Sequence, residues 1–238
     1  MSSEPRRAVR LATVGGDAEA EAVLERGRDL GVLGWVRADE DGMVRIHAEG
    51  DAAAVERLLE GLGPTVQETR AKVEGHEQLA RRGVPAGVFV VQEHQATAHH
   101  YDLRLEVDGV MRSWAVPKGP SLDPAAKRLA VEVEDHDIAY NAFEGRTPGG
   151  AVVVWDRGTY EQGGRVPWPE ALDRGHALFV LHGEKLRGGF ALQRTRGRGP
   201  RAQWLLVKRR DDDARPGSDV VAEQPRSVVS GAALGDLL

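Results

Sequence analysis

Residues 92–106 read QEHQATAHHYDLRLE, and this stretch carries the strongest structural signal in the 238-residue chain. Its pattern predicts two strands joined by a short loop. Side chains alternate between the two faces of a strand, so the second strand separates into two sets. The polar set is His100, Asp102, Arg104 and Glu106. The other set runs from Tyr101 to Val107 and is apolar, so one face is suited to a core and the other to polar chemistry.

Two imidazoles and a carboxylate make this stretch a candidate metal site. His94 precedes the loop and His100 follows it, so folding of the loop brings them together. Asp102 shares the face of His100, about 6–7 Å along the strand. This donor set suits Mn²⁺, Zn²⁺ or Fe²⁺ and leaves positions open for substrate and water. The alternative is a pair of surface histidines beside a salt-bridged aspartate. His99 has the opposite parity and is expected to be a bystander.

Three cations are candidates for binding a phosphate. Arg104 continues the metal-site face, and the planar guanidinium matches phosphate oxygens. Lys118 lies in SWAVPKGP, where two prolines make a rigid turn. Arg128 precedes a further strand. Each of these could equally be an ordinary surface residue.

The strand after Arg128 repeats the design of the first. Glu132, Glu134 and His136 share parity, and Tyr140 follows four residues later. We therefore expect a second strand that presents an acid and a histidine on one face.

Composition narrows the function classes. The chain has no cysteine, which excludes disulfides and thiolate metal sites. No secretory signal or membrane-length apolar run is evident, so we expect a cytoplasmic protein. The net charge is −5. Residues 1–79 hold 10 basic and 16 acidic side chains, whereas residues 80–238 hold 22 and 21. A basic groove is therefore expected only in the rear part.

Periodicity predicts an α+β chain of two domains. After a polar tail at residues 1–8, residues 9–75 read as a ferredoxin-like βαββαβ sandwich, with Asp51 capping the second helix. Residues 76–86 read as a linker. Eight short strands in residues 87–210 predict a mostly antiparallel β-barrel or sandwich, with a hairpin turn at Asp108-Gly109. Residues 211–238 read as a flexible tail.

The front domain resembles the acylphosphatase family through LGVLGWVRADEDGMVRIHAEGDAAAVERLLEGLGP. That family has a glycine-rich phosphate loop ending in an essential arginine, and an asparagine after the Gly-Trp-Val strand. Here those two positions are Ala20 and Ala38, and the loop GGDAEAE is acidic. Its carboxylates would repel a phosphate. The resemblance therefore implies a catalytically inactive domain that serves packing or interaction.

Residues 87–210 resemble the 3'-phosphoesterase module of bacterial DNA ligase D. The resemblance rests on QEHQATAHHYDLRLEVDGVMRSWAVPKGPSLDPAAKRLAVEVEDHDIAYNAFEG, and VWDRGTYE and LHGEKLRGGFALQRT continue it. It implies a manganese-dependent barrel enzyme that removes 3'-terminal phosphates, and 3'-ribonucleotides by way of a phosphate, to leave a 3'-hydroxyl. Other divalent ions such as Zn²⁺ or Co²⁺ could serve.

Carried over by position, the resemblance makes His94, His100 and Asp102 the metal ligands. The remaining functional positions are Gln92, Arg104, Lys118, Arg128, Glu134, His136 and Tyr140. Two departures concern substrate binding. The family's segment with an Arg-Asp pair and a glutamate ahead of the barrel has no counterpart that we can align. The loop after the Phe-Glu-Gly element is reduced to RTPGG, residues 146–150.

We therefore expect an end-healing enzyme of DNA end joining, associated with the nucleoid. Its partners would be DNA or RNA–DNA 3' ends and a separate DNA ligase or other end-joining proteins, without a membrane. Two alternatives stay open at this point. One is a catalytically inert adaptor that binds DNA ends or a ligase. The other is a two-histidine-one-carboxylate iron oxygenase, which would not need three phosphate-binding cations.

Overall fold

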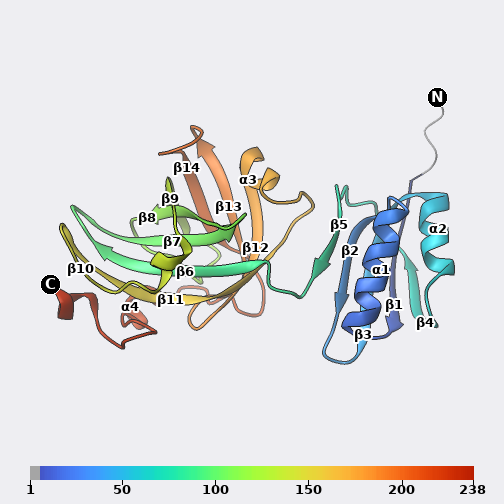
Figure 1. Cartoon of the computed structure of the whole chain (residues 1–238), viewed down its shortest axis with the longest axis horizontal. Helices are drawn as coiled ribbons and strands as arrows, with labels where there is room; N and C mark the ends of the chain where they lie inside the picture. Colours follow the sequence, from blue (N-terminus) through green and yellow to red (C-terminus); the bar gives the residue numbers. More distant parts are fainter. Residues whose placement is uncertain (1–5) are drawn as a thin grey trace. The chain divides into compact units, whose positions relative to one another are not determined.

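The structure is a computed structural model that describes residues 6–238 (Figure 1). The chain divides into two compact units. The first contains the chain up to Val84 together with Gly164–Pro167, and the second contains Pro85–Gly163 and Trp168–Leu238. Among the described residues, no helix has both the length and the apolar character needed to cross a membrane.

The first unit contains the predicted ferredoxin-like sandwich. Its elements are β1 (Arg6–Val14), α1 (Asp17–Asp29), β2 (Leu33–Ala38), β3 (Met43–Asp51), α2 (Ala52–Glu60) and β4 (Thr65–Arg70). The sheet order β4-β1-β3-β2 follows from the two βαβ crossovers. Both helices contribute apolar side chains to one core with the sheet, including Val23 and Leu58. The Asp51 carboxylate accepts hydrogen bonds from the backbone N–H groups of Ala53 and Ala54, which caps α2 as predicted.

The predicted linker and polar tail are both partly wrong. Within residues 76–86, β5 (Leu79–Arg82) pairs in parallel with β2 and extends the sheet. Leu79 is only 2% exposed and joins the core, which explains why this polar stretch is ordered. In the predicted tail, Arg6–Ala8 begins β1, whereas residues 1–5 lie outside the described part of the chain.

The expected phosphate loop is largely the first turn of α1, which begins at Asp17. Ala20, at the family's arginine position, is fully buried in the core. Arg81 of β5 places its guanidinium against the acidic residues of this turn, with Nη2 2.5 Å from Asp17 and Nε 3.1 Å from Glu21. The carboxylates are therefore held by a cation of the same domain.

The second unit is built on eight antiparallel strands, all of which the sequence predicts. They are β6 (Gly87–Gln95), β7 (His99–Val107), β8 (Val110–Val116), β9 (Lys127–His136), β11 (Gly150–Gln162), β12 (His176–Gly183), β13 (Arg187–Arg196) and β14 (Gln203–Lys208). Their order is β11-β12-β13-β14-β9-β8-β7-β6, and pairing of β6 with β11 closes the barrel. The short strand β10 (Gly145–Thr147) and helix α3 (Glu170–Arg174) were not predicted.

The hairpin between β7 and β8 turns at Asp108-Gly109, as predicted. Both residues have positive φ, 51° and 81°, which a two-residue type I′ turn requires. The turn pairs Val107 with Val110 and sets the register of the two strands.

A β-bulge in β9 changes the face to which its last residues belong. Met111 of β8 pairs with His136 and Ser113 pairs with Val133, so two steps along β8 correspond to three along β9. His136 therefore shares the face of Ser113. Glu132 pairs with Trp114 on the opposite face, where it accepts a hydrogen bond from Trp204 Nε1. The prediction that Glu132 and His136 share a face is wrong because simple alternation does not survive the bulge.

The C-terminal segment is ordered, contrary to the predicted flexible tail. It contains α4 (Val220–Glu223) and the 3₁₀ helix η2 (Leu234–Leu237). Val220 and Leu234 are buried, and Leu234 packs against Ala151 and Val153 of β11. The backbone N–H of Val228 also donates a hydrogen bond to the carbonyl of Val154. A few apolar anchors thus outweigh the polar composition.

Candidate metal and phosphate site

The three predicted metal ligands converge on one face of the β6–β7 hairpin. The strand register pairs His94 with His100, and it pairs Gln92 with Asp102. One donor atom from each of His94, His100 and Asp102 lies within 4.8 Å of the others. His94 Nδ1 is 3.7 Å and His100 Nε2 is 3.5 Å from the Asp102 carboxylate.

The orientation of His100 fits a metal ligand. Its Nδ1–H donates to the carbonyl of Ala98 at 2.9 Å, which leaves the lone pair of Nε2 facing Asp102. Metal-bound histidines usually have their second nitrogen fixed in this way. The Asp102 side chain is 9% exposed, while the two imidazoles are 24% and 21% exposed. The residues therefore fit a divalent ion that is held from the protein side and open to solvent on the other.

Arg104 is buried directly beside the carboxylate. Its guanidinium donates from Nη2 to Asp102 at 3.0 Å, from Nε to Gln92 at 3.0 Å and from Nη1 to the Ser113 hydroxyl at 2.9 Å. Three acceptors fix the plane of the group. Arg104 thus supplies a fixed positive charge and also holds Asp102 in place.

Gln92 is fully buried and connects the hairpin to the 3₁₀ helix η1 (Ile138–Ala142). Its oxygen accepts from Arg104, and its Nε2 donates to the carbonyls of Tyr140 and Phe143 at 3.1 and 3.3 Å. Gln92 therefore positions neighbouring groups, and its buried amide faces protein acceptors.

His136 and Tyr140 enter the same neighbourhood from β9 and η1. His136 Nδ1 lies 2.8 Å from the carbonyl of Glu134 and 3.4 Å from the Ser113 hydroxyl. Donation from Nδ1 to the carbonyl leaves Nε2 with a free lone pair. The rings of His136 and Tyr140 are 6.0 Å apart, and Tyr140 stacks on Phe143 at 5.1 Å.

Charge and burial move the pKa values of these groups in different directions. Burial would raise the pKa of Asp102, but the contacts with His100 and His94 and the charge of Arg104 hold it well below its usual range. The contact with Asp102 raises the pKa of His100 despite partial burial. Burial, with the charge of Arg104, lowers the pKa of His136. The face therefore carries the ionised carboxylate of Asp102, the fixed cation of Arg104, and two histidines whose pKa values are shifted in opposite directions, upward for His100 and downward for His136.

Three predicted site residues make no direct side-chain interaction with the cluster around Asp102 and Arg104. Within residues 6–238, no hydrogen bond or ion pair joins the side chains of Lys118, Arg128 or Glu134 to it. Lys118 is exposed in the turn after β8, and Glu134 is exposed at the bulge. Arg128 pairs in register with Leu206 and lies on the face opposite Val133. Its Nε is buried without a hydrogen-bond partner in this part of the chain.

Ser113 is a site neighbour that the sequence analysis missed. It is 1% exposed and lies opposite Arg104 in the β7–β8 register. A serine within the otherwise apolar end of VMRSWAV was the available signal. His99 lies on the other face of β7, as expected, where it pairs with Glu93 at 2.8 Å.

Comparison with protein families divides the chain in the same way as the two resemblances. Residues 92–194 match the DNA Ligase D 3'-phosphoesterase domain, and residues 21–83 match acylphosphatase. The first match contains the whole cluster from Gln92 to Tyr140.

Curated relatives agree with both matches. The multifunctional non-homologous end joining protein LigD of Pseudomonas aeruginosa is 51% identical over 150 residues, which cover 60% of this chain and 18% of the relative. The protein of that name from Mycolicibacterium smegmatis is 39% identical over 194 residues, covering 76% and 24%. The chain thus spans about a fifth of the length of these relatives. An acylphosphatase of Salinibacter ruber is 51% identical over 37 residues, covering 16% of this chain and 39% of the relative.

Solved structures include an acylphosphatase from Coxiella burnetii, with a TM-score of 0.31 and 19% identity, covering 34% of this chain and 100% of that one. The assignment of the two domains rests on the family matches and on the relatives found by sequence, whose identities are far higher than that of this solved structure. The chain joins an acylphosphatase-like domain to a domain of the DNA ligase D 3'-phosphoesterase family.

Proposed function

We propose that the barrel domain is a divalent-metal-dependent phosphoesterase that heals DNA 3' ends during end joining. It would remove 3'-terminal phosphates, and 3'-ribonucleotides by way of a phosphate, to leave a 3'-hydroxyl. The observation that carries this proposal is the convergence of His94, His100 and Asp102 beside buried Arg104. The family match and the LigD relatives support the choice of reaction.

The metal would be Mn²⁺, or another ion such as Zn²⁺ or Co²⁺ that accepts two imidazoles and a carboxylate. A bound ion would offset negative charge on the phosphate oxygens. Asp102 is suited to this position because Arg104, His94 and His100 keep it ionised. The Ala98 carbonyl keeps Nε2 of His100 directed at the same point.

The remaining residues act on the phosphate and on the leaving oxygen. Arg104 adds fixed positive charge where the transition state spreads negative charge. Burial and the charge of Arg104 lower the pKa of His136, which favours the neutral ring in the resting site. A phosphate dianion nearby would supply the opposite charge, so Nε2 could take up a proton and pass it to the sugar oxygen as a water molecule attacks phosphorus and the bond from phosphorus to that oxygen breaks.

The outer residues would contact the DNA end. Lys118 is exposed, so it is suited to a backbone phosphate. Arg128 has a buried Nε and lies on the other face of β9, so it would take no direct part in this contact. Such contacts carry no sequence information and weaken with salt. Glu134 would orient a neighbouring cation, and Tyr140 would lie along the sugar-phosphate chain. A separate DNA ligase would then seal the healed end. We expect the end-healing reaction to take place at the nucleoid.

A labelled-end assay tests the proposal. A 5'-labelled primer-template bearing a 3'-phosphate is incubated with the full chain and Mn²⁺, and conversion to a 3'-hydroxyl is expected. His100→Ala should abolish conversion. His99→Ala is the matched control, since the neighbouring imidazole lies on the other face and should be dispensable. Failure to convert the end with Mn²⁺, Zn²⁺ or Co²⁺ would favour an inert DNA-end or ligase adaptor.

A second substrate separates the two activities. The same primer ending in a 3'-ribonucleotide tests whether the shortened 146–150 loop still permits removal of the nucleoside. Conversion of the 3'-phosphate without conversion of the ribonucleotide would restrict the proposal to phosphate removal.

A further inference from the structure

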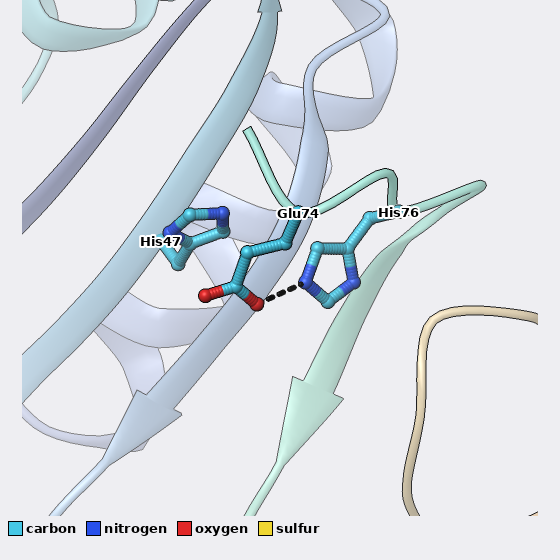
Figure 2. Close-up of side chains that lie close together, drawn as sticks. All are labelled: His47, Glu74 and His76. Carbon is cyan, nitrogen blue, oxygen red and sulfur yellow. Dashed lines mark hydrogen bonds and ion pairs between the residues drawn. The ribbon is translucent and has the colours of Figure 1, made fainter. Parts of the chain in front are cut away.

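A second cluster of metal-type ligands lies in the acylphosphatase-like domain. Figure 2 shows His47 of β3 converging with Glu74 and His76, which belong to the segment before β5. One donor atom from each residue lies within 4.8 Å of the others. The proposed phosphoesterase reaction makes no use of these residues.

The donor spacing is suited to a small divalent ion. Glu74 Oε2 and His76 Nε2 are 3.2 Å apart. Donors around a tetrahedral ion with bonds of about 2.0–2.1 Å are roughly 3.3 Å apart. The imidazole centroids of His47 and His76 are 5.4 Å apart and tilted by 50°. Glu74 is 25% exposed, so it can rotate to close the site and also provides a path for entry.

His47 has an unsatisfied nitrogen. Its side chain is 0% exposed, and Nδ1 makes no hydrogen bond within residues 6–238. Buried polar atoms without partners are rare and call for an explanation. The other nitrogen, Nε2, lies 3.1 Å from the Glu49 carboxylate. Glu49 thus fixes the orientation of the ring, as supporting carboxylates do for metal-binding histidines, while the second nitrogen has no partner among the described residues.

Glu49 also positions the other two residues. Its carboxylate is fully buried and accepts backbone hydrogen bonds from Glu74 at 2.5 Å and from His76 at 2.6 Å. One side chain therefore orients His47 and anchors the segment that carries the remaining donors. Preorganisation of this kind lowers the cost of assembling a ligand set.

The local charge favours a dication. With neutral imidazoles, Glu49 and Glu74 contribute two negative charges beside the donors. In the structure the guanidinium of Arg10 pairs with Glu74 at 2.6 Å, and Arg6 lies 3.9 Å from Glu49. Both arginines are at least half exposed, so they can move aside when an ion arrives.

We propose that His47, Glu74 and His76 form a second metal site, with Glu49 as the positioning carboxylate and a divalent ion of the Zn²⁺ type as ligand. Two imidazoles and a carboxylate leave one position of a tetrahedral ion to water. The bound ion ties the segment before β5 to β3. A domain of the acylphosphatase family would thus hold a metal through residues outside the inherited phosphate loop.

Zinc stoichiometry in the full-length chain tests this site independently of the barrel site. The metal-free protein is equilibrated with Zn²⁺ alone, and bound zinc is measured by elemental analysis after dialysis. We expect two ions per wild-type chain, one in His100→Ala, and none in His100→Ala combined with His76→Gln. Because the barrel site is removed first and the second site is then removed in the same background, failure of one proposal is distinguishable from failure of the other.

Milder variants keep the test valid if His76→Gln does not fold. In the His100→Ala background, Glu74→Gln should weaken zinc binding at least tenfold. Arg10→Gln should strengthen it, because it removes a cation that competes for Glu74. Glu68→Gln is the matched control, since it removes an exposed carboxylate of the same domain that also pairs with an arginine, and it should change nothing. A folded His100→Ala chain that binds no zinc, or whose zinc is unaffected by Glu74→Gln, would overturn the proposal.

Discussion

Arg104 and Asp102 form a buried ion pair, with Nη2 3.0 Å from Oδ2 and side chains only 4% and 9% exposed. Burial disfavours the charge of both groups, so the pair persists because other contacts support it. Gln92 and Ser113 accept from the rest of the guanidinium, and the two histidines face the carboxylate. The charge of Asp102 is thus maintained by several neighbours, and removing any one of them should have measurable effects.

Arg104→Met should damage both stability and activity. Removal of one partner from a buried ion pair costs about 3–5 kcal/mol of unfolding free energy. Loss of a transition-state cation commonly lowers the rate about 10²–10³-fold. Urea unfolding and 3'-phosphate release measure the two effects. Arg157→Met is the control, because that arginine is 54% exposed and pairs with an equally exposed Glu184. An Arg104→Met protein of unchanged activity would exclude a role in charge stabilisation.

The two site histidines should titrate on opposite sides of their ordinary range. In the metal-free protein the pKa of His100 is raised by Asp102, and the pKa of His136 is lowered by burial and Arg104. NMR titration of the ring signals should show His100 protonating first as the pH falls. Arg104→Met should raise the pKa of both rings, because the charge of Arg104 lowers each of them.

Because the pKa of His100 is raised, an increase in pH should lower the stability of the metal-free protein and raise its affinity for the metal. The contribution of His100 to the stability of the metal-free protein is complete below the unfolded pKa, and it is lost as the pH rises through the raised folded pKa. Metal binding needs the neutral ring, so metal affinity should rise over the same interval. Calorimetric titration with Mn²⁺ at several pH values measures the affinity. An affinity independent of pH across this range would remove His100 from the ligand set.

Gln92→Ala should loosen η1 without removing a metal ligand. The change removes the side-chain donor from the carbonyls of Tyr140 and Phe143 and the acceptor from one N–H of Arg104, although the Tyr140 carbonyl keeps the backbone N–H of Phe143. A buried group left unsatisfied costs about 1–3 kcal/mol. Urea unfolding should show this loss, while Mn²⁺ stoichiometry stays unchanged. Faster hydrogen exchange confined to residues 138–143 would identify η1 as the loosened element, and loss of metal would contradict a positioning role.

The acylphosphatase-like domain should not hydrolyse acetyl phosphate. Ala20 and Ala38 stand at the family's arginine and asparagine positions, and Arg81 already occupies the acidic turn. Ala20→Arg should not restore activity, because position 20 is fully buried and a charge there would destabilise the domain. Colorimetric phosphate release tests the wild-type chain, and measurable turnover would contradict the assignment.

Removal of residues 219–238 should destabilise the barrel. The deletion uncovers apolar side chains of β11 that Leu234 covers, and it removes the acceptor of the Trp155 indole N–H. Each buried apolar anchor of this size is worth about 1.5–3 kcal/mol. The midpoint of thermal unfolding should therefore fall. Leu238→Ala is the control, since that side chain is largely exposed.

Strand alternation predicted the part of the site that lies on regular structure. His100, Asp102 and Arg104 share a face because β7 is uninterrupted, and the loop before it returns His94 to their side. All eight barrel strands were likewise evident from short runs of β-branched and aromatic residues. Regular alternation is a local property, so a single sequence suffices to read it.

The features that were missed depend on contacts distant in sequence. The four residues of β5 gain strand structure only by pairing with β2, and the C-terminal segment is ordered by a few apolar anchors. Ser113 joins the site through its register with Arg104 on the neighbouring strand. Arg128 was assigned to the site by family position, whereas its register with β14 sets it on the other face of β9. Composition alone carries no information about such partners.

The bulge in β9 makes the placement of His136 depend on the number of residues that precede it. With simple alternation, His136 would turn toward the side of Trp114 and Trp204, because it lies three residues after Val133. The extra residue of the bulge returns the imidazole to the face of Ser113, in the neighbourhood of Arg104. A change that straightened β9 without shortening it would therefore remove the histidine from the site with no functional side chain substituted, whereas deletion of one residue between Val133 and His136 would remove the bulge and keep the imidazole on the same face.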